Sequence, residues 1–93
     1  MEKLNKICIK AKVTGRVQGV GFRFHTAHQG LKLNLTGYAR NESDGSVTVL
    51  ACGEQTQVEK LLHWLAHGPD TARVTAMQYQ EQPWRAIDGF SIR

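Results

Sequence analysis

The chain has 93 residues, which we expect to form a single domain (residues 1–93) around one hydrophobic core. Its apolar content of 41% is typical of a globular protein, and it has neither an apolar run near the ~20 residues of a membrane span nor a signal peptide, so we expect a cytoplasmic protein without a membrane partner. The net charge of +4 favours anionic partners such as phosphates.

The first half of the chain predicts a strand, a loop, a helix and a second strand. Apolar residues alternate with polar ones over residues 7–14, which is the period of a half-buried strand. A glycine-rich loop follows over residues 15–21. Residues 22–33 carry apolar and small side chains at helical spacing, and Asn34 is expected to end this helix in a left-handed conformation. Residues 35–41 then predict the second strand.

The next stretch predicts a hairpin and a second helix. "ESDG" at residues 42–45 contains the Asp-Gly pair typical of a turn between two strands, and residues 46–52 form the third predicted strand. From Val58 onwards, apolar residues recur at the i, i+3, i+4 and i+7 positions of an amphipathic helix. Gly68 and Pro69 are expected to end it.

A weaker strand over residues 72–80 and a short one over residues 90–93 complete the pattern. The order β-α-β-β-α-β predicts an α+β, ferredoxin-like sandwich, in which one antiparallel sheet carries both helices on one face. Another small α+β sandwich with a different strand order is the alternative.

In the ferredoxin-like arrangement, the glycine-rich loop and Asn41 come to the same edge of the sheet. The first two strands are joined through a helix, so they run parallel by a right-handed crossover. The third strand lies between them, which places them about 10 Å apart. The first helix also begins at this edge, with its unpaired N–H groups. Asn41 shares a face with Gly37 and Ala39, and is expected to point towards the loop.

This edge has the composition of a phosphate site. A glycine-rich loop that leads into a helix N-terminus forms a cradle of backbone donors for an anion. Arg23 adds a permanently charged fork that suits phosphate, and Asn41 adds a neutral donor and acceptor. The alternative is that the glycines only make a tight turn and Arg23 is a surface residue. The predicted phosphate-binding residues are Gly15, Arg16, Val17, Gln18, Gly19, Val20, Gly21 and Phe22.

Three stretches of the chain resemble the acylphosphatase family. "VTGRVQGVGFR" is similar to its first signature, "LTGYARNESDGSVTVLACG" to its second, and "GPDTARV" to the stretch before its fourth strand. The resemblance covers nearly the whole chain and implies a ferredoxin-like hydrolase that cleaves the carboxyl–phosphate bond of acyl phosphates. It also implies that Arg23 and Asn41 are the catalytic residues. The chain departs from the family pattern at Gly30, Asn34 and Tyr38, which lie outside the proposed site.

The chemistry of acyl phosphates explains why two side chains and a loop suffice for hydrolysis. The leaving group is a carboxylate, whose conjugate acid has a pKa of about 4, so it departs without a general acid. Phosphoryl transfer has a loose transition state, so Asn41 need only orient a water while Arg23 and the loop amides stabilise the phosphoryl oxygens. We expect no cofactor and no metal. The expected partners are a small acyl phosphate, with inorganic phosphate or sulfate as a competing anion, and the expected state is a monomer.

Other functions fit the sequence less well. Four histidines at helical spacing suggest a metal site, but they have no acidic or cysteine partner nearby, so we interpret them as exposed residues of the helices. They are His25, His28, His63 and His67. A ferredoxin-like RNA-binding module would need aromatic residues on the inner strands, which are absent here, so no nucleic-acid partner is expected. A regulatory anion-binding module without turnover is the remaining alternative.

The two cysteines are predicted to face each other. A register that pairs Ile9 with Ala51 and Val13 with Val47 places apolar residues of the first and third strands together on the helix face. The same register sets Cys8 opposite Cys52 on the other face, where the Cα atoms of directly opposed residues are close enough for a disulfide. We therefore predict that Cys8 and Cys52 form a disulfide when oxidised, although a reducing cytoplasm favours free thiols.

Overall fold

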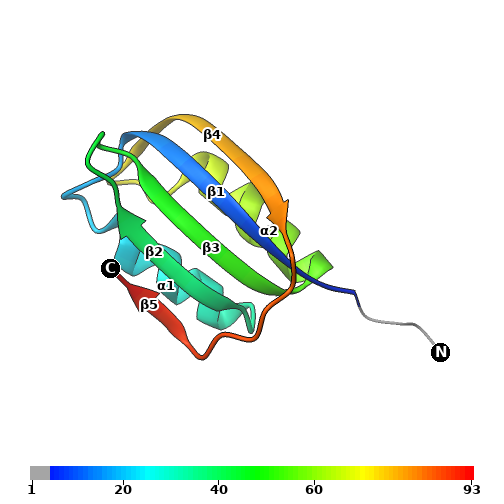
Figure 1. Cartoon of the computed structure of the whole chain (residues 1–93). Coiled ribbons are helices and arrows are strands. Elements are labelled where there is room, and N and C mark those ends of the chain that lie inside the picture. The colour runs from blue at the N-terminus through cyan, green and yellow to red at the C-terminus, as the bar shows by residue number, and fades with distance from the viewer. Residues whose placement is uncertain (1–4) are drawn as a thin grey trace.

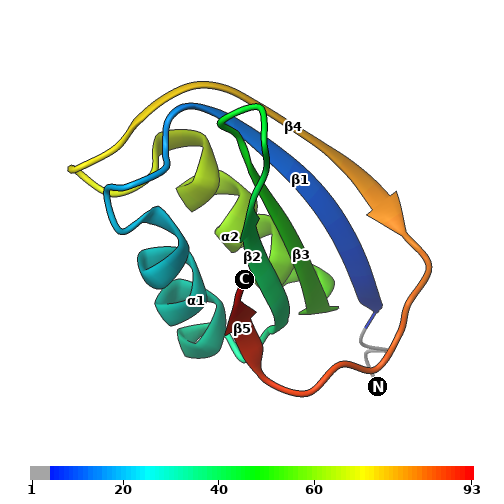
Figure 2. The ribbon, with the colours of Figure 1, turned by 60° about the vertical axis from the view of Figure 1, so that its left-hand side comes forward.

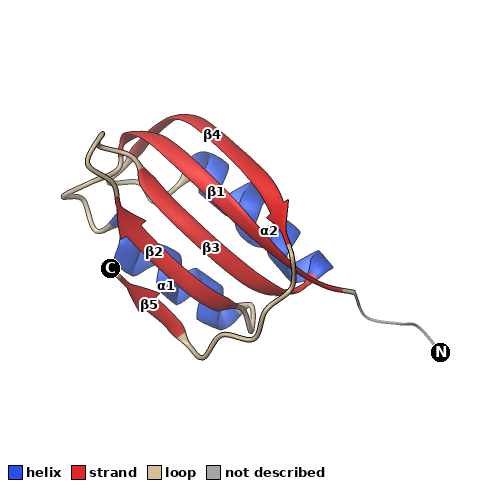
Figure 3. Ribbon diagram, in the orientation of Figure 1, coloured by secondary structure: helices blue, strands red, loops and turns tan. Residues whose placement is uncertain are grey.

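The computed structural model describes residues 5–93; residues 1–4 lie outside the described residues. Strands and helices follow each other in the predicted order, with a fifth strand at the end (Figure 3). The elements are β1 (Lys6–Arg16), α1 (Phe22–Lys32), β2 (Thr36–Asn41), β3 (Val47–Glu54), α2 (Gln55–His67), β4 (Arg73–Gln82) and β5 (Phe90–Ile92). Neither helix is long and apolar enough to cross a membrane.

The five strands form one sheet in the order β4-β1-β3-β2-β5, and both helices cover the same face (Figures 1 and 2). The four longer strands are antiparallel to their neighbours, as predicted. The short β5 differs, because it pairs parallel with β2 and makes the sheet mixed. The chain after β4 crosses from one edge of the sheet to the other before β5 begins, which brings β5 alongside β2 in the same direction (Figure 1).

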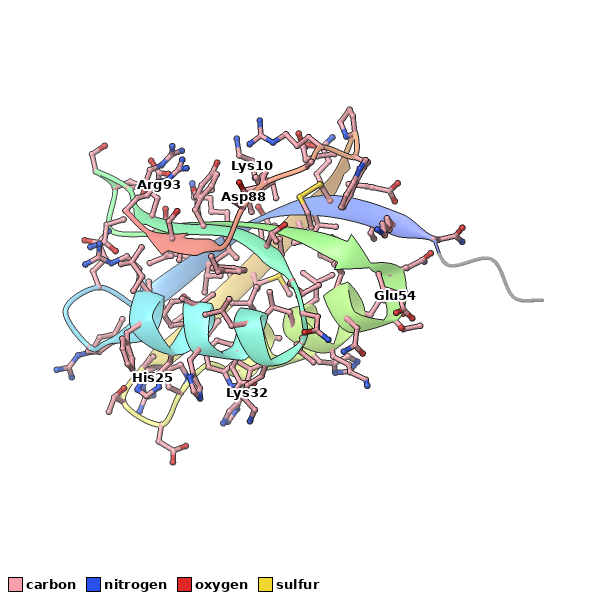
Figure 4. The ribbon with its side chains drawn as sticks, turned by 90° about the horizontal axis from the view of Figure 1, so that it is seen from below. Lys10, His25, Lys32, Glu54, Asp88 and Arg93 are labelled. Atoms are coloured by element: carbon pink, nitrogen blue, oxygen red, sulfur yellow. A yellow bond between two sulfur atoms is a disulfide. The ribbon has the colours of Figure 1, made fainter. Side chains whose placement is uncertain are left out.

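The register of β1 against β3 is the predicted one. Ile9 pairs with Ala51 and Val13 pairs with Val47. Cys8 therefore stands opposite Cys52, and the two are joined by a disulfide with their Cα atoms 4.0 Å apart. Figure 4 shows this bond on the side of the sheet away from the helices.

The strands bury different side chains on their two faces. The main core lies between the sheet and the helices, and includes Ile9, Val13 and Val49 from the strands with Leu61 and Leu65 from α2. A smaller cluster on the opposite face consists of Cys8, Tyr38, Leu50 and Cys52, with Ile87 packed against it. The chain between β4 and β5 thus covers part of the face that carries no helix.

Two predicted boundaries differ because of long-range pairing. The sequence placed Gly15 at the start of the loop, but a register shift after Thr14 lets β1 continue to Arg16 against β4. Likewise, β4 extends to Gln82 because its last residues pair with β1. The end of α1 is close to the prediction, and Asn34 has the expected left-handed backbone, with φ of 59°.

The predicted turn at residues 42–45 connects β2 to β3. The N–H of Glu42 donates to the Ser46 carbonyl at 2.8 Å, which closes the hairpin. The Asp44 carboxylate accepts hydrogen bonds from the Ser46 hydroxyl and N–H, at 2.6 and 3.0 Å. The pKa of Asp44 is held well below its usual value, mainly by the bond from the Ser46 hydroxyl and also by the bond from the Ser46 N–H and the nearby Lys12 ammonium. The turn therefore keeps its charge and its geometry at neutral pH.

Candidate active site

Four parts of the chain lie together at one edge of the sheet: the loop of residues 17–21, the start of α1, the end of β2 and the end of β5. In Figure 1 they lie together at the end of the molecule opposite the N-terminus. Figure 4 labels Arg93 at this end, above the first turn of α1. The crossover from β1 through α1 to β2 brings the loop and Asn41 to the same edge, as the sequence predicts.

The backbone of the loop turns through two left-handed glycines before α1 begins. Gly19 and Gly21 have φ of 75° and 77°, which an L side chain adopts only with strain. A Cβ added at Gly19 would meet nothing within 4 Å, so this glycine serves the backbone conformation and not close packing. No side chain caps α1, and its first turn carries no acidic residue. The first N–H groups of the helix are therefore left to an external acceptor.

Gly15 has a different role from the other loop glycines. A Cβ at this position would lie 2.2 Å from the Arg73 carbonyl oxygen and 2.9 Å from the Thr75 nitrogen. Gly15 is therefore required for the close approach of β1 and β4 at the register shift. Together with Arg16 it belongs to the strand, and only the residues that follow form the loop.

Arg23 and Asn41 meet at one oxygen atom. Nη1 of Arg23 donates to the main-chain oxygen of Arg93 at 2.6 Å, and the N–H of Asn41 donates to the same oxygen at 3.3 Å. Arg93 is held in turn by its own N–H, which donates to the Ala39 carbonyl at 2.8 Å, and by its guanidinium, which lies 4.2 Å from the centre of the Tyr38 ring. The end of β5 thus orients the Arg23 side chain.

The side chain of Asn41 has an unused acceptor. Its Oδ1 is buried and has no hydrogen-bond partner among the described residues. Buried polar atoms are nearly always paired, and an unpaired one costs about 1–3 kcal/mol. Asn41 lies on the helix side of β2, two residues after the fully buried Ala39. An atom of this kind at a sheet edge is suited to bind a small polar molecule such as water.

A cavity of about 130 Å³ lies at the start of α1. It is lined by Val17, Gly19, Gly21, Phe22, Arg23, Phe24 and Ile92. Five of these are residues that the sequence predicted for the site; Phe24 and Ile92 are not. Asn41 does not line the cavity; its backbone N–H shares the Arg93 oxygen with the guanidinium of Arg23, which does line it.

Two side chains hold the loop in place, and sequence reasoning missed their roles. Nε2 of Gln18 donates to the carbonyls of Glu42 and Ser46, at 2.8 and 2.9 Å, and so ties the loop to the hairpin that follows Asn41. The Thr71 hydroxyl donates to the Val20 carbonyl at 2.8 Å. Gln18 was predicted only as part of the phosphate-binding stretch. Its side-chain amide, which offers two donors, is the sequence feature that could have indicated a role in holding the loop.

The histidines do not line the cavity, although the His25 ring lies next to Gly21 and Phe24, which do. All four histidines are exposed on the helices, as expected from the sequence. Within residues 5–93, no three His, Cys, Asp or Glu side chains are grouped closely enough to hold a metal ion. A larger hollow of about 760 Å³ lies over β1, β4 and the hairpin turn, and is lined by residues that include Lys10, Lys12 and Asp44. None of its lining residues is a predicted site residue.

Comparison with known proteins identifies the family. The family model described as "Acylphosphatase" matches residues 9–92. An acylphosphatase of Photobacterium profundum is 58% identical over 97% of this chain and 100% of its own length. The structure of an acylphosphatase from Coxiella burnetii superimposes with a TM-score of 0.92 at 36% identity, covering 100% of both chains, and that from Bacillus subtilis with 0.85 at 31% identity, covering 94% and 98%. The chain therefore belongs to the acylphosphatase family, the hydrolases of acyl phosphates.

Proposed function

We propose that the site at the start of α1 carries out acyl phosphate hydrolysis, with Arg23 and the amides of residues 17–22 binding the phosphoryl group and Asn41 orienting the attacking water. The observation that carries this assignment is the buried, unpaired Oδ1 of Asn41 at the same edge of the sheet as the cavity lined by Arg23. The guanidinium of Arg23 and the backbone N–H of Asn41 donate to the same Arg93 oxygen, which places the two residues next to each other at this edge.

The phosphoryl group needs positive charge around its oxygens. Arg23 has five N–H donors, and the Arg93 oxygen is the acceptor that it contacts among the described residues, which leaves donors for a bidentate contact. The uncapped N-terminus of α1 adds backbone N–H groups and the positive end of the helix dipole. Charge that develops on the phosphoryl oxygens in the transition state is stabilised by these donors.

The water attacks phosphorus in line with the bond that breaks. Oδ1 of Asn41 accepts a hydrogen bond from this water and so directs its lone pair at phosphorus. The bond between phosphorus and the acyl oxygen breaks, and the electron pair leaves with the carboxylate. The proton of the water passes to a phosphoryl oxygen, so the products are a carboxylate and dihydrogen phosphate. Because a carboxylate is a stable leaving group, no side chain has to protonate it.

Hydrolysis in ¹⁸O-labelled water tests this mechanism. The protein is first treated exhaustively with EDTA, and acetyl phosphate turnover is then followed with inorganic phosphate as competitor. We expect activity to persist, the label to enter the phosphate, and inorganic phosphate to inhibit competitively. Label in the acetate would mean attack at the carbonyl carbon, and activity that needs added Mg²⁺ or Zn²⁺ would mean that protein groups alone do not supply the charge.

The remaining expectations concern the state of the protein. The single domain, the monomeric state, the cytoplasmic location and the lack of nucleic-acid or membrane partners stay predictions from the sequence. Light scattering on the eluting peak of a gel-filtration column measures the oligomeric state directly.

A further inference from the structure

The cavity beside Arg23 has an apolar wall that phosphate binding does not use. Five large apolar side chains are markedly exposed among the described residues, and two of them, Phe24 and Ile92, line this one small cavity; they are 64% and 47% exposed. The cavity volume of about 130 Å³ corresponds to about four water molecules. That space suits a phosphoryl group and its water, so the acyl group of a substrate has to extend outwards over the wall.

The two wall residues come from different elements that are packed together. Phe24 follows Arg23 in the first turn of α1. Ile92 lies on the helix-facing side of β5, because it alternates with Arg93, whose guanidinium lies over Tyr38 on the opposite face. Figure 2 shows β5 running beside α1. The ring of Phe90, on the same side as Ile92, fills the space that a Cβ at Gly30 would occupy, which fixes β5 against α1.

The wall has no polar side chain that would recognise a substituted acyl group. Among the residues that line the cavity, Arg23 carries the one polar side chain, and the proposed function assigns it to the phosphoryl group. An acyl group with hydroxyls or a second carboxylate would lose hydration against Phe24 and Ile92 without gaining a partner. An apolar or aromatic acyl group would instead cover exposed apolar surface.

We propose that Phe24 and Ile92 form an apolar subsite for the acyl group and make this enzyme selective for acyl phosphates with an apolar or aromatic acyl part. This inference rests on the proposed function of the same cavity. The two residues act on the part of the substrate that does not react, so they change the choice between substrates more than the chemical step.

The test compares benzoyl phosphate, which has an aromatic acyl group, with acetyl phosphate, which has a methyl group. Phe24→Ala and Ile92→Ala are measured beside Leu31→Ala, which removes another exposed apolar side chain of α1 that does not line the cavity. A well-placed apolar contact in a closed pocket is worth about 10- to 200-fold in kcat/KM, and for this half-open wall we expect about 5- to 10-fold. The ratio of kcat/KM for benzoyl phosphate to that for acetyl phosphate should fall by this factor in each wall variant.

The ratio should stay within about twofold of the original in Leu31→Ala, and inhibition by inorganic phosphate should change little in any of the three variants. An unchanged ratio in both wall variants would overturn the subsite. So would an equal loss with both substrates, because that is the result of a displaced Arg23. If the unaltered chain hydrolysed neither substrate, the proposed function would fail and the subsite with it. Hydrolysis of both substrates together with an unchanged ratio would instead contradict the subsite alone.

Discussion

The oxygen atom of Arg93 connects the side chain of Arg23 to the backbone N–H of Asn41. Arg23 and Asn41 could both be predicted, because a loop of glycines before an arginine and an asparagine at the end of a parallel strand point to one edge. Their link through Arg93 could not, since it depends on where β5 lies against β2. The sequence pattern identifies the groups to which we assign the chemistry, whereas the contact that orients the guanidinium depends on the tertiary structure.

Replacement of Arg23 tests its forked geometry. Arg23→Ala should abolish phosphate inhibition and turnover, because it removes the side-chain charge that faces the ligand. Arg23→Lys should recover little, since a single ammonium cannot both reach the Arg93 oxygen and bind two phosphoryl oxygens. The measurements are kcat and the inhibition constant of inorganic phosphate, with Arg85→Lys as an exposed control outside the site. Near-normal activity of Arg23→Lys would show that one positive charge suffices.

At the scale of the elements, strand and helix identities follow from periodicity, while their ends depend on partners. Residues 7–14 alternate as a strand, yet β1 runs to Arg16 because β4 pairs with it beyond the register shift. Gly15 was predicted as a phosphate-binding glycine from its neighbours in sequence. Its position shows that it is also needed for close packing against Arg73, which no local pattern reveals.

The loop between β1 and α1 is expected to depend on Gln18. Gln18→Ala removes two hydrogen bonds to the hairpin, each worth about 1 kcal/mol, and should weaken phosphate inhibition together with kcat/KM by about tenfold. Gln18→Glu has the same shape but a carboxylate that only accepts, so it should be at least as harmful. The exposed Gln78 on β4, changed to Ala, is the control. Full activity of Gln18→Glu would mean that the two bonds do not position the loop.

For the whole molecule, the register of β1 against β3 was predictable because the apolar residues of both strands have to share the helix face, which excludes shifts of one residue. A shift of one residue between β1 and β3 would have moved Ile9 and Val13 from the core to the opposite face. The disulfide follows from that register. The short strand β5 was predicted over residues 90–93, but its parallel pairing with β2 was not predictable, since its position depends on the path of the preceding chain.

Reduction of the disulfide should lower stability with little effect on activity. Cys8 and Cys52 are 44 residues apart, and closing a loop of this length stabilises a chain by about 4 kcal/mol in the loop-entropy description. We expect the melting temperature to fall by about 15–30 °C after reduction, measured by circular dichroism, while kcat stays within about twofold because the bond lies far from the site edge. In the Cys8→Ala/Cys52→Ala double variant, the reductant should have no effect. A large loss of kcat on reduction would show that the disulfide and the active site are coupled.

The division of work between Arg23 and Asn41 is the central claim, and the Asn41→Ala variant tests it most directly. Its kcat for acetyl phosphate and the inhibition constant of inorganic phosphate are measured in the same preparation. The account predicts a loss in kcat of about 10²–10³ or more, the scale of removing one well-placed polar group, with phosphate inhibition nearly unchanged because the partner of Oδ1 is the water. An Asn41→Ala variant that keeps its kcat but no longer binds phosphate would contradict these separate roles of Arg23 and Asn41.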